Sequence, residues 1–246
     1  MFRKIHDDVA IIVPSRIEST RLSRKPLKLI GKTSMIEHVL SQINKTKLQH
    51  VYVATDSKDI ASIAQGIGGK YIMTDSSLAS GTDRVFAAFN NLPNKTQFKY
   101  VINVQGDMPF IEPSTILTVI DNLKKNEFEI MTPAVKVDLK TAQTASNVKI
   151  VVSKTNKALY FSRNMIPHSG EEFLYHIGVY GFTVQALAKF VSLPVTSLEK
   201  TENLEQLRAL YNNIDIGVCY INNIPISVDT QHDLDMAINF YNNQLT

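Results

Sequence analysis

Short apolar runs alternate with amphipathic helical patterns along the first half of the chain, and this alternation limits the possible folds more than any other feature. Apolar residues fill the strand-sized runs 9–13, 51–54 and 71–73, and they dominate the run 100–104, which also contains Asn103. Between and after these runs, apolar side chains recur at helical spacing over 35–43, 60–67, 85–92 and 116–123. A short, fully apolar run is typical of a strand that is buried on both faces. The order therefore predicts an α/β fold with a mostly parallel, Rossmann-like sheet flanked by helices.

Local signals mark where two of these helices begin and end. Ser34 and Glu37 have the spacing of a capping box, in which each side chain bonds the other residue's backbone N–H. Asp56 or Ser57 can cap the next helix, and Gly68-Gly69 predicts its end. These signals agree with the apolar periodicity and strengthen the helix predictions.

The pattern changes after about residue 128. Strand patterns occur at 130–137, 148–152, 158–161 and 176–182, and Thr155-Asn156 is typical of a hairpin turn. Helical patterns return at 184–191, 198–211 and 230–241, and further strand patterns occur at 216–221 and 226–228. No linker rich in Pro, Gly or Ser separates the halves. We therefore expect a single domain over residues 1–246, with a smaller antiparallel β insertion at about 130–183.

Composition excludes several classes of protein. Lys plus Arg number 26 and Asp plus Glu 23, so the formal net charge of +3 is too small to indicate nucleic-acid binding. No apolar run approaches the roughly 18–20 residues that cross a bilayer. The one cysteine, Cys219, cannot form an internal disulfide, and we expect it to be a small apolar strand residue. The six histidines lack a compact metal-binding spacing. We expect a cytoplasmic protein that binds neither nucleic acid nor membrane.

The segment after the first strand, residues 14–26, concentrates positive charge. It carries four cations, Arg16, Arg21, Arg24 and Lys25, against one anion, and it contains no glycine. It therefore differs from the glycine-rich phosphate loops, which need bare backbone close to phosphate. Because ligands of open α/β sheets bind at the carboxyl ends of strands, these side chains are candidates for binding phosphate oxygens. A solvated loop is the alternative, and we assign Arg24 to the surface.

Two aspartates follow predicted strands. Asp107 comes after the run that ends at Val104, and Asp229 comes directly after 226–228. Two carboxylates that face a triphosphate would suit Mg²⁺, which prefers oxygen ligands. A turn role for Asp107 and a helix cap for Asp229 remain the alternatives.

A second candidate loop follows the third strand, over residues 80–84. Ser80 or Thr82 can cap the helix that follows. Alternatively, Ser80 and Arg84 contact a nucleotide at the same edge of the sheet. The sequence leaves both interpretations open.

Nine short motifs occur in a fixed order over nearly the whole chain. They are Pro14-Ser15-Arg16, Ser19-Thr20-Arg21-Leu22, Lys25-Pro26-Leu27, Ser80-Gly81-Thr82-Asp83-Arg84, Asn103-Val104-Gln105-Gly106-Asp107, Ala158-Leu159-Tyr160-Phe161-Ser162-Arg163, His176-Ile177-Gly178-Val179-Tyr180, Leu204-Glu205-Gln206-Leu207-Arg208 and Val228-Asp229-Thr230. In this order the chain resembles the 3-deoxy-manno-octulosonate cytidylyltransferase family, also called CMP-Kdo synthetases. The resemblance implies a nucleotidyltransferase fold and the Mg²⁺-dependent transfer of CMP from CTP to the acid sugar Kdo, with release of pyrophosphate, for lipopolysaccharide biosynthesis.

The family's site residues can be transferred onto matching positions. The resemblance implies that Arg16, Arg21, Lys25, Ser80 and Arg84 bind the nucleotide. It implies that Asp107 and Asp229 hold Mg²⁺ and, together with Lys25, are the catalytic residues. It places the sugar near Gln105, Arg163, His176, Glu205 and Gln206. Because adjacent residues of a helix diverge by about 100°, we expect at most one of Glu205 and Gln206 to point into a pocket. The family also implies a homodimer. Tyr160 and Phe161 are expected in the core, and Arg208 in a surface ion pair.

The chain departs from the family pattern in three places. Ser23-Arg24 replace the usual Pro-Gly before Lys25-Pro26, Met108 replaces a usual Glu, and the segment from Arg163 to His176 is short. Two alternatives therefore remain beside Kdo activation. One is a cytidylyltransferase for another acid sugar, such as an amino-substituted Kdo or a sialic acid. The other is a nucleotide- or sugar-binding module without catalysis, against which the pair of aspartates argues.

Overall fold

The computed structural model describes residues 6–19 and 21–244. The chain divides into two compact units, residues 1–116 with 225–246, and residues 117–224. The expected α/β class, with a parallel sheet and helices together with antiparallel strands, is confirmed. The prediction of one domain with an insertion at about 130–183 stays a prediction.

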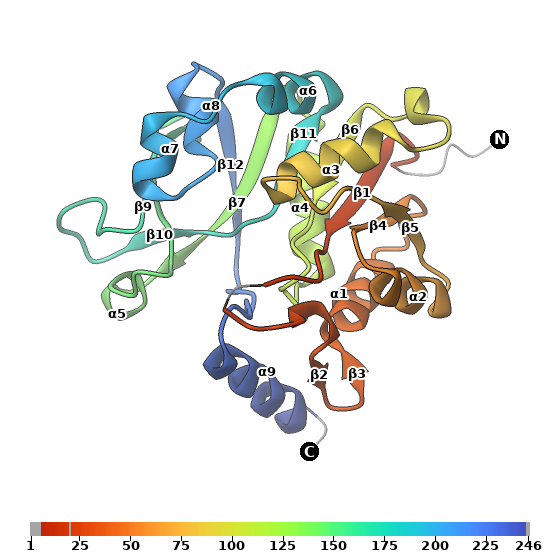
Figure 1. Cartoon of the computed structure of the whole chain (residues 1–246). Helices are drawn as coiled ribbons and strands as arrows, with labels where there is room; N and C mark the ends of the chain where they lie inside the picture. The colour runs from red at the N-terminus through yellow and green to blue at the C-terminus, as the bar shows by residue number, and fades with distance from the viewer. Residues whose placement is uncertain (1–5, 20, 245–246) are drawn as a thin grey trace. The chain divides into compact units, whose positions relative to one another are not determined.

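The first unit contains a parallel sheet with the strand order β5-β4-β1-β6 (Figure 1). Its strands are β1 (Val9–Pro14), β4 (Val51–Thr55), β5 (Lys70–Met73) and β6 (Tyr100–Asn103). The central strand β1 is buried along its whole length, and Ile12 is opposite Tyr52 on one side and Asn103 on the other. Complete burial explains why the β1 sequence is apolar throughout and does not alternate with polar residues.

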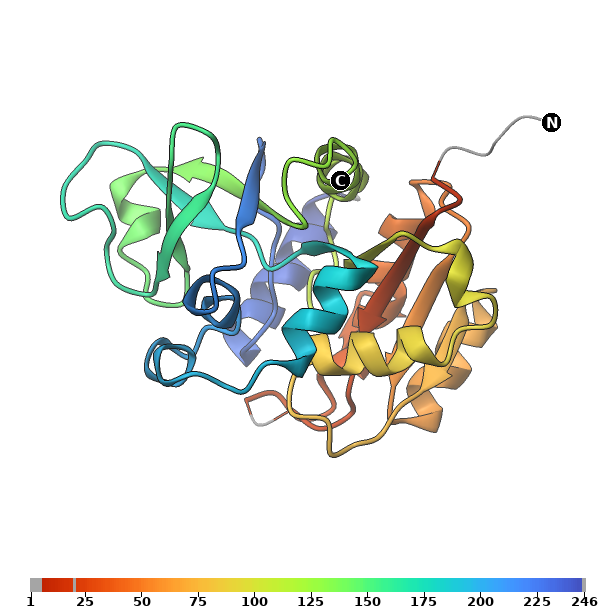
Figure 2. The same ribbon diagram turned by 90° about the horizontal axis from the view of Figure 1, so that it is seen from above.

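Helices occur between these strands as the periodicity predicts. They are α1 (Met35–Asn44), α2 (Lys58–Gly66) and α3 (Gly81–Asn90), and α4 (Pro113–Leu123) follows β6. The capping box at the start of α1 is confirmed, because the Ser34 backbone N–H donates to Glu37 Oε2 at 2.8 Å. Ser57, and not Asp56, is the residue at the N-cap of α2. Figure 2 shows α3 beside β1, with which it packs.

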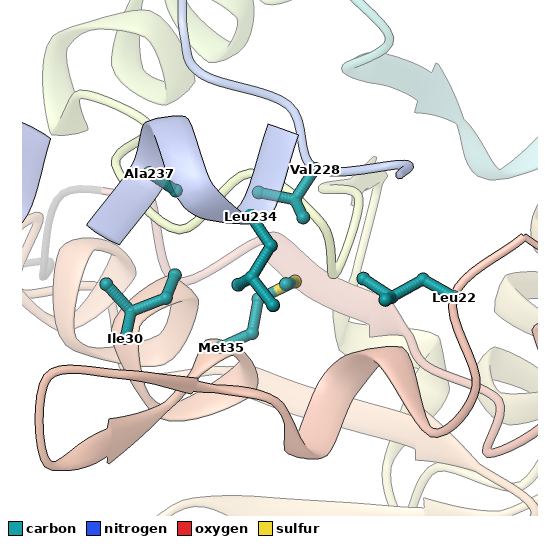
Figure 3. Close-up of a cluster of buried hydrophobic side chains, with 6 residues drawn as sticks. All are labelled: Leu22, Ile30, Met35, Val228, Leu234 and Ala237. Atoms are coloured by element: carbon teal, nitrogen blue, oxygen red, sulfur yellow. The ribbon is translucent and has the colours of Figure 1, made fainter. Parts of the chain in front are cut away.

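A cluster of buried side chains joins the end of the chain to the segment after β1. Two short strands, β2 (Leu29–Ile30) and β3 (Thr33–Ser34), form a hairpin against which α9 (Gln231–Asn243) packs. The cluster consists of Leu22, Ile30, Met35, Val228, Leu234 and Ala237 (Figure 3). Residues that are about 200 positions apart in the sequence thus pack in one apolar cluster. This packing fixes the position of Asp229, the residue after Val228.

The predicted strand at 226–228 is wrong. These residues have no strand structure, and the Val228 backbone N–H donates instead to the carbonyl of Asp107 at 2.9 Å. The alternation of Ile226, Ser227 and Val228 mimics a half-buried strand. In the structure, the apolar residues of this segment pack into the cluster of Figure 3.

The second unit is built on antiparallel strands in the order β11-β7-β10-β8-β9, and β12 pairs with β7 in parallel. The strands are β7 (Ile130–Val137), β8 (Lys149–Val152), β9 (Ala158–Ser162), β10 (Phe173–His176), β11 (Tyr180–Thr183) and β12 (Ile216–Ile221). The hairpin turn before β9 is confirmed, with Asn156 in the left-handed region. The predicted strand 176–182 is two strands, which pair with different parts of β7.

The helices of the second unit are α5 (Leu139–Ala142), α6 (Val184–Ser192), α7 (Ser197–Glu202) and α8 (Leu207–Tyr211). The single helix predicted over 198–211 is interrupted, because Asn203 adopts φ 53° at the end of α7. The expected surface ion pair of Arg208 is also wrong. Arg208 is 4% exposed, and its guanidinium donates to both carboxylate oxygens of Glu199 at 2.6 and 2.9 Å. Because the pair is buried away from water, the charge of each side chain is compensated by the other.

Two core predictions for the second unit are borne out in part. Phe161 is fully buried, whereas Tyr160 is half-buried and donates its hydroxyl to Glu202. Cys219 lies buried in β12, and burial raises the pKa of its thiol to about 12. The thiol is therefore protonated at neutral pH and unreactive.

Over the described residues, no helix has the length and apolar character needed to cross a membrane.

Candidate active site

A pocket of about 290 Å³ lies in the first unit, where β1 and β6 end. The segment after β1, the loop before α3, the turn after β6 and one residue before α9 form its wall. The lining residues are Pro14, Ser15, Arg16, Glu18, Ser19, Arg21, Lys25, Pro26, Leu78, Ala79, Ser80, Gly81, Arg84, Gln105, Gly106, Asp107 and Asp229. This is the edge at which open α/β sheets bind ligands. Every nucleotide- and metal-binding residue predicted from the sequence lies in this wall.

The segment 14–26 places three of its four cations in the wall and directs the fourth away. Arg16 is exposed, and the guanidinium of Arg21 lies 3.1 Å from an Asp229 oxygen. Arg24 pairs at the surface with Asp59, as its surface assignment predicts. Thr20, which belongs to one of the family motifs, lies outside the described residues.

The departure at Arg24 has a structural meaning. Arg24 adopts φ 52°, ψ 37°, a left-handed conformation that favours glycine and costs other residues roughly 1 kcal/mol. Glycine is the residue that the resemblance implies at this position. The following residues, Lys25–Leu27, form a 3-10 helix that begins directly after this turn. The arginine thus keeps the backbone turn at a small conformational cost.

Lys25 lies between the two aspartates at the centre of the wall. Its Nζ donates to Asp107 Oδ2 at 2.7 Å and to Asp229 Oδ1 at 2.9 Å. Burial tends to lower the pKa of Lys25, but the two carboxylates outweigh burial, so that the pKa is raised above its usual value. The ammonium is therefore charged at neutral pH and neutralises much of the repulsion between the carboxylates.

Asp229 is not the helix cap. Thr230 caps α9 and forms a capping box with Asp233. The carboxylate of Asp229 is instead directed to Arg21 and Lys25. Asp107 has the same partner in Lys25, so the two aspartates form one acidic pair, although they are 122 positions apart in the sequence.

The loop before α3 confirms one of the two interpretations that the sequence leaves open, the helix cap at Ser80. Ser80 caps α3 by accepting from the Asp83 backbone N–H at 3.1 Å, and it also lies in the pocket wall. Arg84 is 2% exposed; its guanidinium donates to Thr74 Oγ1 at 2.6 Å and to Asp56 Oδ2 at 3.2 Å. Nucleotide contact by Ser80 and Arg84 stays a prediction.

Two further groups at the end of the sheet are polar and close to the pocket. The Gln105 side chain donates to Asn103 Oδ1 at 3.2 Å. The Ser15 hydroxyl is buried, and the described residues offer its oxygen no hydrogen-bond partner. A buried hydroxyl without a partner costs free energy, which a ligand bound in this pocket would recover. A Cβ at Gly106 would lie 3.0 Å from the Pro14 carbonyl, which explains the glycine between Gln105 and Asp107.

The other predicted sugar residues belong to the second unit. Arg163 follows β9 and donates to the Asn203 carbonyl at 3.4 Å. Glu205 is half-buried before α8, whereas Gln206 is 6% exposed at its N-cap. His176 is buried, with its Nε2 2.9 Å from Thr132 Oγ1, and burial lowers its pKa to about 3. A neutral imidazole cannot supply charge to an acid sugar. Sugar binding by these residues stays a prediction.

Asp107 and Asp229 form a pair of acids around Lys25, and Glu18 is a further acid in the wall. Within residues 6–19 and 21–244, no group of three or more His, Cys, Asp or Glu side chains could hold a metal ion. The paired carboxylates of Asp107 and Asp229 offer hard oxygen ligands of the kind that Mg²⁺ uses together with phosphates and water. The pair thus fits a cation that arrives with a nucleotide, and does not fit a closed protein-only metal site.

Sequence reasoning missed one residue behind the wall. Asp56 accepts from the Ile17 backbone N–H at 3.0 Å and from Arg84 at 3.2 Å. From the sequence, Asp56 is a candidate only for a helix cap. Its position one residue after an apolar strand, like that of Asp107 after its strand, was the available signal.

Comparison with known proteins agrees with this architecture. A family model described as cytidylyltransferase matches residues 10–216. A putative glucose-1-phosphate thymidylyltransferase from Bacillus anthracis, solved with sucrose, has a TM-score of 0.69 at 12% identity, covering 94% of each chain, which indicates a shared fold. The fold and the matched family define a nucleotidyltransferase.

Relatives with higher identity narrow this class. A 3-deoxy-manno-octulosonate cytidylyltransferase of Rickettsia felis is 57% identical over 238 residues, 97% of each chain. The protein of that name from Rickettsia canadensis is 56% identical and covers 97% of this chain and 98% of its own. The structure of CMP:2-keto-3-deoxy-manno-octonic acid synthetase complexed with CTP has a TM-score of 0.90 at 31% identity, covering 96% of this chain and 99% of its own. The chain belongs to the cytidylyltransferase family and, within it, to the 3-deoxy-manno-octulosonate cytidylyltransferases.

Proposed function

We propose that this protein transfers CMP from CTP to Kdo, with Mg²⁺, and releases CMP-Kdo and pyrophosphate for lipopolysaccharide biosynthesis. The observation that carries the proposal is the pocket at the ends of β1 and β6, where a cationic segment faces an acidic pair. The chain is 56–57% identical, over almost their full length, to relatives named 3-deoxy-manno-octulosonate cytidylyltransferase, and this identity supports the same reaction.

The cationic segment is suited to the triphosphate. Arg16 and Arg21 can bind phosphate oxygens through two N–H groups at once, and Lys25 supplies a compact charge. Their guanidinium and ammonium groups lie in one wall with Ser80. Cations held in place before the reaction stabilise the charge that develops on the leaving pyrophosphate.

The acidic pair is suited to the metal. Asp107 and Asp229 both direct a carboxylate oxygen to one cation, the Lys25 ammonium, at 2.7 and 2.9 Å. They would hold Mg²⁺ in the same way, and the bound ion would supply neutralisation and polarisation of the reacting phosphate. Lys25, displaced from the carboxylates, would then be available for phosphate oxygens.

The reaction is a displacement at phosphorus. The anomeric hydroxyl oxygen of the sugar forms a bond to the α-phosphorus, the bond from that phosphorus to the bridging oxygen of pyrophosphate breaks, and the hydroxyl proton passes to solvent. The residues of this chain orient the two substrates and neutralise charge. We assign no protein base. The predicted sugar contacts of Gln105, Arg163 and Glu205 would fix the orientation of the carboxylate and hydroxyls.

Release of pyrophosphate tests the proposal. The purified protein, with CTP and Mg²⁺, is expected to release pyrophosphate with Kdo and to form a CMP-sugar. Turnover with an amino-substituted Kdo or a sialic acid, but not with Kdo, would favour the other acid-sugar reaction. Binding of CTP without turnover of any acid sugar would favour a binding module.

Two further properties belong to the proposal. We expect a homodimer, which light scattering would detect as a mass of twice 27.6 kDa. We also expect a cytoplasmic enzyme, and the buried free thiol of Cys219 is consistent with a reducing compartment. Fractionation of the source cells would test the location.

A further inference from the structure

We infer that Asp56 is a positioning residue for the triphosphate: it holds the cationic segment 14–26 against the sheet by joining Ile17 to Arg84. Asp56 lies outside the pocket wall, so it acts through residues that line the pocket. The inference rests on the proposed use of CTP and assigns a role to a residue that the family motifs do not include.

Asp56 continues the pairing of β1 where its backbone ladder with β4 ends. The ladder between β1 and β4 reaches Pro14 and Ala54, and the Ser15 N–H then donates to the Ala54 carbonyl at 2.9 Å. Two residues later, the Ile17 N–H donates to Asp56 Oδ1 at 3.0 Å. A side chain thus continues the pairing beyond the end of the sheet. The residue between these bonds is Arg16, a predicted phosphate ligand.

The other oxygen of the Asp56 carboxylate is held by Arg84. Asp56 Oδ2 accepts from Arg84 Nη2 at 3.2 Å, and both side chains are buried, 7% and 3% exposed. Arg84 also donates to Thr74 Oγ1 at 2.6 Å, and the Thr74 N–H donates to the Thr55 carbonyl at 2.8 Å. Asp56 therefore takes its own orientation from a buried, hydrogen-bonded partner. A carboxylate held at one oxygen presents the other at a fixed position.

The Asp56 carboxylate also compensates the positive charge of Arg84 close to Arg16. Arg84 is a buried cation that also faces Arg16 and Asp75, and burial lowers its pKa despite the neighbouring Asp56. With the Asp56 carboxylate in place, Arg84 can lie close to Arg16 without leaving an uncompensated buried charge. A neutral side chain at position 56 would leave two guanidinium groups repelling each other at the start of the segment. Arg16 would then move away from its place in the wall.

Two variants with one matched control test this role. Asp56→Asn removes the charge but keeps the size, and Asp56→Glu keeps the charge beside Arg84 but displaces the oxygen that Ile17 uses. The control is Asp59→Asn, which makes the same chemical change in an exposed acid that pairs with Arg24 of the same segment. Calorimetry would measure the Kd of CTP and of CMP for the full chain, with Mg²⁺ present. CMP keeps the base, the ribose and the α-phosphate but lacks the two outer phosphates.

We expect both Asp56 variants to raise the Kd of CTP about tenfold, the effect of one charge-assisted hydrogen bond, and to raise that of CMP less than about twofold. Asp59→Asn should leave both constants unchanged. Equal weakening of CTP and CMP, or an unchanged CTP constant, would overturn the inference. If Asp56→Glu does not fold, Asp56→Asn alone decides between these outcomes. If the unmodified protein binds no CTP, it is the proposed function that fails.

Discussion

Replacement of Lys25 by methionine tests the centre of the site. Methionine has a similar length but no charge, so the change removes the ammonium from between Asp107 and Asp229 and leaves the apolar stem. Two charge-assisted hydrogen bonds, of 2.7 and 2.9 Å, are lost. Such bonds contribute roughly 1.5–3 kcal/mol each when they are shielded from water.

The exposure of the three groups reduces this magnitude. The side chain of Lys25 is 16% exposed, that of Asp107 22%, and that of Asp229 36%, so water screens the second contact more than the first. We expect the free energy of unfolding to fall by about 2 kcal/mol, which urea denaturation would measure. Turnover should fall by about 10²–10³-fold, as when one fixed group that stabilises transition-state charge is removed.

Divalent cations give a second, independent signal for this variant. Under the proposed function, Mg²⁺ would have to displace an ammonium from the acidic pair of the unmodified protein, whereas in Lys25→Met this ammonium is absent. Thermal unfolding without nucleotide should therefore show a larger Mg²⁺-dependent rise in Tm for the variant. Lys28→Met, three residues further along and outside the pocket wall, is the control. Turnover within tenfold of the unmodified enzyme, together with an unchanged response to Mg²⁺, would refute this account of Lys25.

Three further predictions concern stability. Arg208→Met leaves the Glu199 carboxylate buried without its partner, and denaturation should show a loss of about 3–5 kcal/mol. His176 has a pKa of about 3 in the fold against 6.5 in an unfolded chain, so its contribution is complete above pH 6.5 and falls as the pH drops, by about 2 kcal/mol at pH 5. The unfolded chain takes up the proton that the fold excludes, and His176→Gln should show a flatter dependence of stability on pH. Arg24→Gly relieves a left-handed turn but loses the exposed pair with Asp59, so the free energy of unfolding should change by less than about 1 kcal/mol.

The parallel half of the fold could be predicted because its signals are local. The apolar runs of β1, β4 and β6 and the capping box at Ser34 each depend on residues that are neighbours in the chain. The predictions that failed depend on distant partners. The segment 226–228 has a strand-like alternation, but its apolar side chains pack into a cluster with Leu22 and Met35. Arg208 is buried because Glu199 faces it across the turn at Asn203, and no periodicity reports such a turn.

The same distinction applies to the candidate site. The cationic segment and Asp107 are recognisable because each follows an apolar strand at the edge where ligands bind. The sequence places Asp56 after an apolar strand, but its two partners could not be predicted, because they depend on which backbone N–H and which guanidinium the fold brings to its oxygens. Arg84 shows the reverse: the sequence presents it as a ligand, whereas the structure shows that much of its hydrogen-bonding capacity serves Asp56 and Thr74.

The charges of the pocket imply an order among its ligands. Without ligands, the Lys25 ammonium is engaged by Asp107 and Asp229, Arg21 is also paired with Asp229, and the charge of Arg84 is offset outside the wall. These pairings leave less positive charge to face an incoming triphosphate, which still meets the exposed Arg16 in the wall. Under the proposed function, a divalent cation on the acidic pair would change this balance, because it would release both Lys25 and Arg21 toward the phosphates and add its own charge. We therefore expect tight binding of the triphosphate to require that the acidic pair exchange one cation for another, and we expect nucleotide to bind more weakly without metal.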